Sequence, residues 1–184
     1  MIKSTEFYIT PKGDVMIETQ SGIKKLEFSD RDFINKLYNQ FNELYPAAME
    51  ALSQEFVKFR SIPAMHEFMI VRRMIKCNFG KYDSVMDIDH LGNLNFEEVD
   101  CPLRGECHLE NVVCKPKLNS KLSERELQIM QLLYEGYPKK DVAAACAVSI
   151  ETVRTHKRNA FRKLGVHSLA EFNSYANQKN LFEN

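Results

Sequence analysis

Four helical patterns follow one another in residues 122–172, LSERELQIMQLLYEGYPKKDVAAACAVSIETVRTHKRNAFRKLGVHSLAEF. Ser123 and Ser149 are good N-caps for the first and third patterns, and the fixed backbone of Pro138 suits the first turn of the short second one. Apolar residues recur at helical spacing within each pattern. The sequence therefore predicts an all-α, four-helix module over residues 122–184.

The second and third patterns have the order of a helix-turn-helix. In that motif a short helix and a tight turn lead to a longer helix that enters the major groove of DNA. Arg154, Arg158 and Arg162 lie four residues apart on the third helix, and residues 149–166 hold five basic residues against one acidic residue. A helical bundle with a solvated basic face is the alternative. We expect helix 149–164 to read the major groove, where arginine bonds guanine edges.

This stretch resembles the DNA-binding module of LuxR/FixJ-type transcriptional regulators. The motifs that carry the resemblance are L-S-x-R-E at residues 122–126, the glycine after the first helix, S-x-x-T-V-R-x-H at residues 149–156 and K-L-G-V at residues 163–166. The resemblance covers about the last third of the chain without gaps. It implies a sequence-specific regulator of transcription that binds double-stranded DNA and is not an enzyme.

The resemblance also implies roles for single residues. Positions that commonly face the bases hold Arg154, Thr155 and Arg158, and positions near the phosphates hold Lys140, Thr152, His156 and Lys157. Members usually dimerise through the last helix, so we expect a homodimer through helix 168–179, with RNA polymerase as a further partner to consider. The chain departs from the family pattern at Pro138 and Lys139, which replace the usual Ser-Asn, and at Cys146, where a larger aliphatic residue is common.

Composition sets the broad class of the protein. With 184 residues, 44% of them apolar and 27% charged, the chain is typical of a soluble globular protein of one or two domains. The net charge is zero, but residues 1–118 hold 15 basic and 18 acidic residues, whereas residues 119–184 hold 10 and 7. We see no apolar run long enough to span a membrane and no signal peptide, so we expect a cytoplasmic protein with no membrane association.

Residues 1–114 are predicted to form an α+β domain that senses a signal or docks a partner. The order of elements, first strands, then helices, then loops, is not that of a receiver domain. We expect a small meander, three helices and a cysteine-containing loop module, with strands at 6–9, 15–19 and 24–28 and helices that begin after Ser29 and at Pro46 and Pro63. The run KPKLNSK, residues 115–121, has no apolar face and is the predicted linker.

Three cysteines, Cys101, Cys107 and Cys114, lie within fourteen residues, and Cys77 could supply a fourth thiolate. Four thiolates suit either a tetrahedral zinc ion or an iron–sulfur cluster, with His108 as a reserve ligand. The spacing is not that of a zinc ribbon, so the identity of the metal stays open. The alternative is that these cysteines are reduced, partly buried thiols without a metal. A disulfide pair is a further, less favoured alternative.

The segment DIDHLGNLNFEE, residues 87–98, partly matches an EF-hand calcium loop. Leu91 stands where an oxygen ligand is needed, and Pro102 follows before an exit helix could form. We therefore prefer a hairpin that turns at residues 91–93 and do not expect calcium.

Two other functions remain as alternatives to the regulator. One is a sigma-factor-like or mobile-element accessory DNA-binding protein, because the same helix-turn-helix geometry serves there. The other is an iron–sulfur or metal-dependent DNA-processing protein, for which Asp87, Asp89 and Glu98 are the only dense carboxylates. Neither alternative has a recognisable catalytic motif in this sequence.

Overall fold

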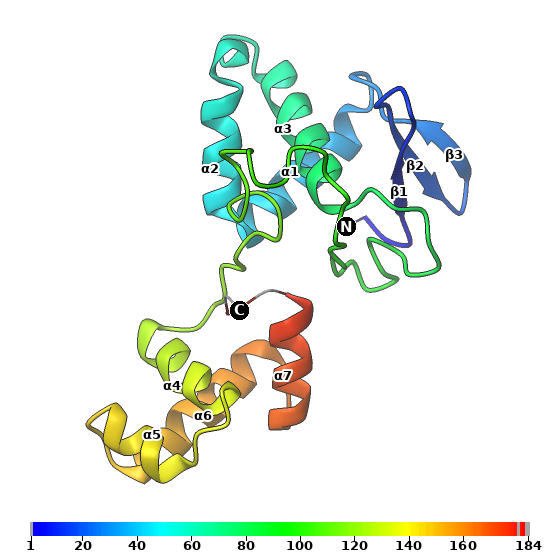
Figure 1. Ribbon diagram of the computed structural model, residues 1–184. Helices are drawn as coiled ribbons and strands as arrows, with labels where there is room; N and C mark the ends of the chain where they lie inside the picture. The colour runs from blue at the N-terminus through cyan, green and yellow to red at the C-terminus, as the bar shows by residue number, and fades with distance from the viewer. Residues whose placement is uncertain (1, 180, 183–184) are drawn as a thin grey trace. The chain divides into compact units, whose positions relative to one another are not determined.

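The computed structural model describes residues 2–179 and 181–182. The chain divides into two compact units, Met1–Asn119 and Ser120–Asn184, which Figure 1 shows in a colour gradient along the chain. The division falls within the segment predicted as a linker. Leu118 is buried, and the Asn119 amide donates to the Leu44 carbonyl at 2.7 Å, so residues up to 119 belong to the first unit.

The first unit begins with a three-stranded antiparallel sheet in the order β1-β2-β3 (Figure 1). The strands are β1 (Glu6–Ile9), β2 (Val15–Thr19) and β3 (Gly22–Lys25). The first two match the expected segments, whereas the third lies earlier than the expected 24–28. The reason is the tight turn after β2, which pairs Thr19 with Gly22 directly. Leu26, expected inside the strand, instead follows it and is buried.

Helices cover this sheet and form the core of the first unit. They are α1 (Arg31–Leu44), α2 (Pro46–Glu55), the short 3-10 helix η1 (Val57–Phe59) and α3 (Pro63–Asn78). The helix α3 packs against β1, β2, α1 and α2, so it is the central element of the unit (Figure 1). Its apolar stripe, Ile70, Val71, Met74 and Ile75, is completely buried.

Two helix boundaries differ from the expected ones. The helix α1 is preceded by Asp30 at the cap position rather than by Ser29, and the Asp30 carboxylate turns back to the Glu27 amide and the Lys24 ammonium. The helix α2 ends at Glu55, so Phe56 lies outside it and contacts the ring of Phe59 across the 3-10 turn. Both differences arise from local side-chain contacts that periodicity does not register.

Residues 79–123 contain no named helix or strand, although all of them are described. Two isolated antiparallel bridges, Thr5 with Ile88 and Ile88 with Leu94, attach this loop to the start of β1 and close a turn at Asp89. Phe79 is buried and contacts the rings of Phe41 and Phe96. The loop is therefore part of the core of the first unit and not a loose connection.

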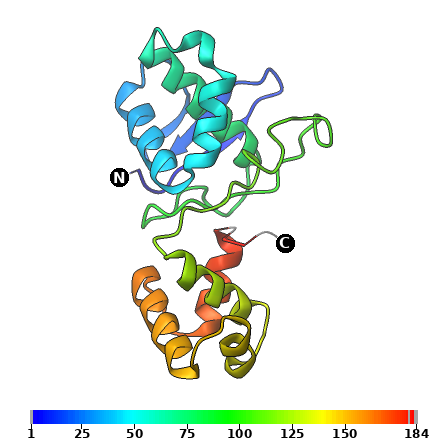
Figure 2. The same cartoon turned by 90° about the vertical axis from the view of Figure 1, so that its left-hand side faces the viewer.

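The second unit consists of four helices, α4 (Glu124–Tyr134), α5 (Lys139–Ala145), α6 (Ile150–Leu164) and α7 (Leu169–Gln178). Figure 2 shows them in yellow-green, gold, orange and red. The helix α4 packs against α5, α6 and α7, and α5 packs against α6. None of the described helices in either unit is long and apolar enough to cross a membrane.

Candidate functional sites

Local contacts fix the turn between α5 and α6. Ser149 caps α6 by accepting a hydrogen bond from the Thr152 amide at 3.0 Å, and the amide of Val148 donates to the Ala143 carbonyl at 2.9 Å. Ala147 adopts a left-handed backbone with φ of 52°, which turns the chain sharply between the helices. The guanidinium of Arg125 on α4 donates to the Cys146 carbonyl and ties this turn to α4.

The buried side of α6 fixes which residues face outward. Val153 and Ala160 are completely buried, and Lys163 pairs with the buried Glu126 at 2.5 Å. Burial raises the pKa of Glu126, but hydrogen bonds from Lys163 and Ser123 outweigh burial, so the net shift is downward. Lys163 is thus a structural cation that joins the end of α6 to the start of α4.

A basic groove runs along the more exposed side of α6. We use this name for the depression of about 580 Å³ lined by Arg154, Lys157, Arg158 and Arg162 together with Phe161 and residues 165–167. The Lys157 ammonium lies 4.9 Å from the centre of the Phe161 ring. Burial and, second, the neighbouring Lys139 lower the pKa of Lys157. The groove therefore concentrates positive charge on the helix predicted to enter DNA.

Two arginines of the groove differ in their partners. Arg154, whose side chain is 60% exposed, forms an ion pair with Glu151 at 3.0 Å. Arg158 is exposed and has no ion pair with any residue that the structure describes. Arg158 can therefore contact a ligand without breaking an ion pair, whereas Arg154 must first break its ion pair with Glu151.

The remaining residues predicted to contact DNA are spread along α5 and α6. Lys140 is exposed on α5, and Thr155 and His156 are half-buried on α6. The Thr152 hydroxyl lies 2.9 Å from that of Ser149 and so shares in the N-cap. None of these four lines the basic groove, whereas Arg162, which was not among the predicted contacts, does. Its spacing of four residues from Arg158 was the signal that could have identified it.

The helix α7, through which a homodimer was predicted, buries its apolar residues within its own unit. Phe172 and Ala176 are buried, and Phe172 contacts the rings of Phe161 and Phe182. Tyr175 is half-buried, and burial raises the pKa of its hydroxyl. The outward side of α7 carries small and polar residues: Ala170, Glu171, Ser174, Asn177 and Gln178.

The four cysteines predicted to act together line one cavity of about 70 Å³, which we call the cysteine cavity. Cys77 comes from the last turn of α3, and Cys101, Cys107 and Cys114 come from the loop. Burial, with a smaller contribution from Cys114, raises the pKa of Cys77 to about 12 when all thiols are reduced. His108 lies apart from the cavity lining and contacts Glu55 at 3.0 Å. Cys146 is buried in the second unit.

The carboxylates of residues 87–98 do not gather as a nuclease site would require. Asp89 accepts hydrogen bonds from Leu91 and Asn93 within its turn, and Glu98 lies near Arg104 and Lys115. This turn has the backbone of the hairpin that was preferred over a calcium loop, with Ile88 bridged to Leu94.

Asp87 instead lies in a buried group with Glu6 and Glu97, whose carboxylate oxygens are all within 4.8 Å of one another. Asp87 is completely buried and accepts a hydrogen bond from the Phe7 amide at 2.7 Å. Burial, followed by the nearby charges of Glu6 and Glu97, raises its pKa to about 9. Asp87 is therefore protonated at neutral pH.

Comparisons with known proteins agree with the geometry of the second unit. Residues 120–176 match the family model described as bacterial regulatory proteins, luxR family. The C-terminal region is 44% identical over 62 residues to the protein named oxygen regulatory protein NreC from Staphylococcus aureus strains JH9, JH1 and Mu3. That match covers 34% of this chain and 29% of each relative.

The relatives share only the C-terminal part of this chain, so the comparisons describe that part alone. No solved structure matches the chain. The matched segment contains the whole of α4, α5 and α6 and most of α7, including the capped turn and the basic groove. Residues 120–176 are a helix-turn-helix DNA-binding domain of the bacterial LuxR regulatory family.

Proposed function

We propose that this protein is a sequence-specific transcriptional regulator that reads the major groove of DNA with α6. The observation that carries the proposal is the division of α6 into two sides. Val153, Ala160 and Lys163 hold it to its own domain, and the basic groove faces outward. A helix of this kind fits a major groove about 12 Å wide. We expect the protein to act in the cytoplasm, where bacterial DNA lies.

The residues of α5 and α6 divide into two roles in this proposal. Arg154, Thr155 and Arg158 contact base edges, and Lys140, Thr152, His156 and Lys157 hold the phosphates on either side. Arg158 supports the first role because it is exposed and unpaired within the described chain. Lys157 supports the second because its ammonium is held in place over Phe161. Arg162 extends the phosphate contacts along the groove.

We further propose that the protein binds DNA as a homodimer through the outward side of α7. Two copies related by a two-fold axis would read half-sites about one helical turn apart. The polar character of that side favours a weak association that DNA strengthens, since neither copy offers a large apolar patch there. The word oxygen in the relatives' name describes those proteins, and the shared part supports DNA binding without indicating a signal for this chain.

The test begins with selection of a preferred site from a random duplex library, followed by affinity measurements on that site and on random duplex. Arg158→Ala should lose about 1–3 kcal/mol on the selected site and much less on random DNA. Lys157→Ala should weaken both and lower the salt dependence by about one charge. Lys163→Ala is not a clean control because it leaves the buried Glu126 unpaired, whereas Lys12→Ala removes one exposed lysine of the first unit and is the control for the lost charge.

Two outcomes would contradict the proposal. One is equal loss on selected and random duplex for Arg158→Ala and Lys157→Ala. The other is the absence of any preferred site after selection. A protein that binds its site as a monomer in ultracentrifugation would leave the reading of DNA intact and contradict only the dimer.

A further inference from the structure

The cysteine cavity brings together residues that are far apart in the sequence. Cys77 lies in the last turn of α3, and the other three thiols come from a loop that has no helix or strand to position them. All four side chains are half-buried, and none of the five cysteines, all of which lie among the described residues, forms a disulfide. Reduced thiols converging on one cavity are the donor set of a metal centre.

Asn78 connects the two chain segments that carry Cys77 and Cys114. Its side-chain amide donates to the carbonyl of Val113 at 2.8 Å, and its side-chain oxygen accepts from the Lys115 amide at 3.0 Å. Asn78 directly follows Cys77, and residues 113 and 115 flank Cys114. One completely buried side chain therefore holds Cys77 and Cys114 beside each other.

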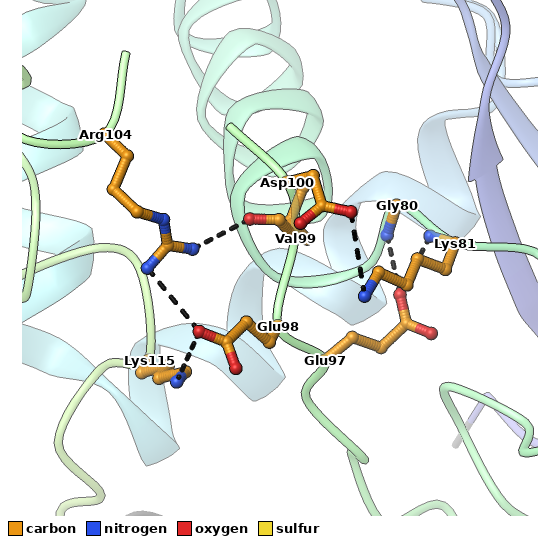
Figure 3. A network of polar contacts seen from close by, with 8 residues as sticks. All are labelled: Gly80, Lys81, Glu97, Glu98, Val99, Asp100, Arg104 and Lys115. Atoms are coloured by element: carbon orange, nitrogen blue, oxygen red, sulfur yellow. Dashed lines mark hydrogen bonds and ion pairs between the residues drawn. The ribbon is translucent and has the colours of Figure 1, made fainter. Parts of the chain in front are cut away.

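A second set of polar contacts holds the segment that leads to Cys101, as Figure 3 shows. Glu97 accepts hydrogen bonds from the amides of Gly80 and Lys81 at 2.8 and 2.9 Å. Arg104 donates to the Val99 carbonyl at 2.8 Å, and Lys115 lies 3.4 Å from the Glu98 carboxylate. The cavity wall is thus built by specific contacts, in the way that functional sites on loops are supported.

The spacing of the sulfur atoms distinguishes between the two kinds of centre. Around a zinc ion with Zn–S bonds of about 2.3 Å, tetrahedral sulfurs lie about 3.8 Å apart. Among the described residues, the only group of three or more potential ligands whose donor atoms all lie within 4.8 Å is Glu6, Asp87 and Glu97, and it includes no cysteine. No three of the four sulfurs have the spacing of one zinc site in this structure, whereas in an iron–sulfur cluster each thiolate binds a different iron atom and the sulfurs lie farther apart.

The size and charge of the cavity agree with that spacing. Its volume of about 70 Å³ is several times the roughly 10–15 Å³ that a single water molecule needs. Arg104 and Lys115 contribute to its lining, and the Arg73 side chain interacts with Cys77 and Cys107. The buried Nε of Arg73 has no hydrogen-bond acceptor in the described part of the chain. Thiolate and sulfide would supply that acceptor and a negative charge opposite these cations.

We propose that Cys77, Cys101, Cys107 and Cys114 ligate an iron–sulfur cluster in the first unit. The cluster has one cysteine from the end of the central helix α3 and three from the loop, and Arg73 is a positioning residue beside it. This proposal does not depend on the DNA-binding role of the second unit, because the cavity lies entirely within Met1–Asn119.

The test uses the full chain purified without oxygen. Iron, acid-labile sulfide and zinc per chain are measured, and the visible absorption and the electron paramagnetic resonance of the dithionite-reduced protein are recorded. We expect iron and acid-labile sulfide in equal amounts, about two or about four of each per chain, with broad visible absorption. Cys101→Ser and Cys107→Ser should lose most of the iron. Cys146→Ala is the matched control, because it removes a cysteine from the other unit and should retain the cluster.

Zinc at one atom per chain without sulfide would overturn the proposal. So would a folded, metal-free chain that gains no visible absorption when it is incubated under argon with ferric iron, sulfide and a thiol reductant. Circular dichroism checks that the serine variants are folded. If they are not folded, the iron and sulfide content of the unaltered chain decides, and DNA affinity measured separately distinguishes this proposal from that for α6.

Discussion

The basic groove and the cysteine cavity hold their functional side chains by different means. In the groove, one regular helix sets the spacing of Arg154 and Arg158, and serine caps and buried alanine and valine residues fix the helix. In the cavity, no regular element positions three of the four cysteines, and buried polar side chains such as Asn78 and Glu97 do so instead. We therefore expect the loss of one supporting contact to disturb the cysteine cavity more than the basic groove.

The largest expected effect concerns Asp87, a buried carboxyl group in the same loop as the three cysteines of the cavity. Asp87 has a pKa of about 9 in the folded chain against 3.8 for the free group, so between these values the folded chain holds a proton that the unfolded chain has lost. Its contribution to stability is complete below about pH 4 and is lost as the pH rises towards 9. The free energy of unfolding should fall by at most about 1.4 kcal/mol per pH unit in this window.

Urea unfolding of the full chain at several pH values between about 4 and about 9, followed by circular dichroism, measures this slope. Asp87→Asn should flatten it, because the amide keeps an oxygen for the Phe7 N–H and cannot ionise. Asp100→Asn is the control, since the Asp100 side chain is 96% exposed. If the dependence of the free energy of unfolding on pH is the same in Asp87→Asn as in the unaltered chain, Asp87 is ionised in the folded chain throughout this range. A neutral, buried carboxyl group would then not be what holds the loop to the sheet.

The next effect tests whether one polar side chain holds the cysteine loop. Asn78→Ala removes the hydrogen bond to the carbonyl of the buried Val113 and the one from the Lys115 amide. We expect a loss of about 1–3 kcal/mol, the cost of a buried group left without its partner. Hydrogen exchange of amides in α3 and β1 measures it within the full chain.

Asn119→Ala is the matched control for Asn78→Ala. Asn119 is an exposed asparagine of the same unit whose side-chain amide makes only a long, 3.4 Å contact with the Glu43 carbonyl. It should change exchange in α3 very little. Equal protection in the two variants would mean that the loop does not rely on Asn78, and the contrast between groove and cavity would be weaker than described.

The smallest effect tests the helical side of the comparison. Ser149→Ala removes the N-cap of α6, which should cost about 1 kcal/mol of stability in the second unit. Because packing still holds α6 against α4 and α5, the affinity for DNA should fall only a few-fold. Circular dichroism melting and a fluorescence binding assay measure the two quantities. Ser61→Ala, an exposed serine of the first unit, should change neither, and a complete loss of binding with Ser149→Ala would show that the cap itself contacts DNA.

The sequence predicted the second unit well because its determinants are local. Ser123 and Ser149 cap their helices as expected, Ser168 caps α7 in the same way, and Gly165 ends α6 in the left-handed conformation. These signals act over a few residues, so they can be read one at a time. Arg162 was missed as a contact although its spacing from Arg158 indicated it, and the part that residues 165–167 play in lining the groove had no local signal.

The first unit was predicted only in outline because its determinants are distant in sequence. The pairing of strands and the proline starts of α2 and α3 could be expected from local patterns, and four cysteines could be grouped by type. No local pattern indicates that Asp87 joins Glu6 or that Asn78 reaches Lys115. That a metal occupies the cysteine cavity stays a prediction, which the measurement of iron, sulfide and zinc per chain tests.

The hydrogen bond between Leu44 and Asn119 has a consequence for biosynthesis. A ribosome makes the chain from its N-terminus, and domains generally fold as units while they emerge. The bridge from Thr5 to Ile88, the contact from Asn78 to Lys115 and the bond from Leu44 to Asn119 each wait for the later partner to be made. The first unit therefore completes its fold only once residue 119 has left the exit tunnel, when synthesis of the DNA-binding helices is already under way.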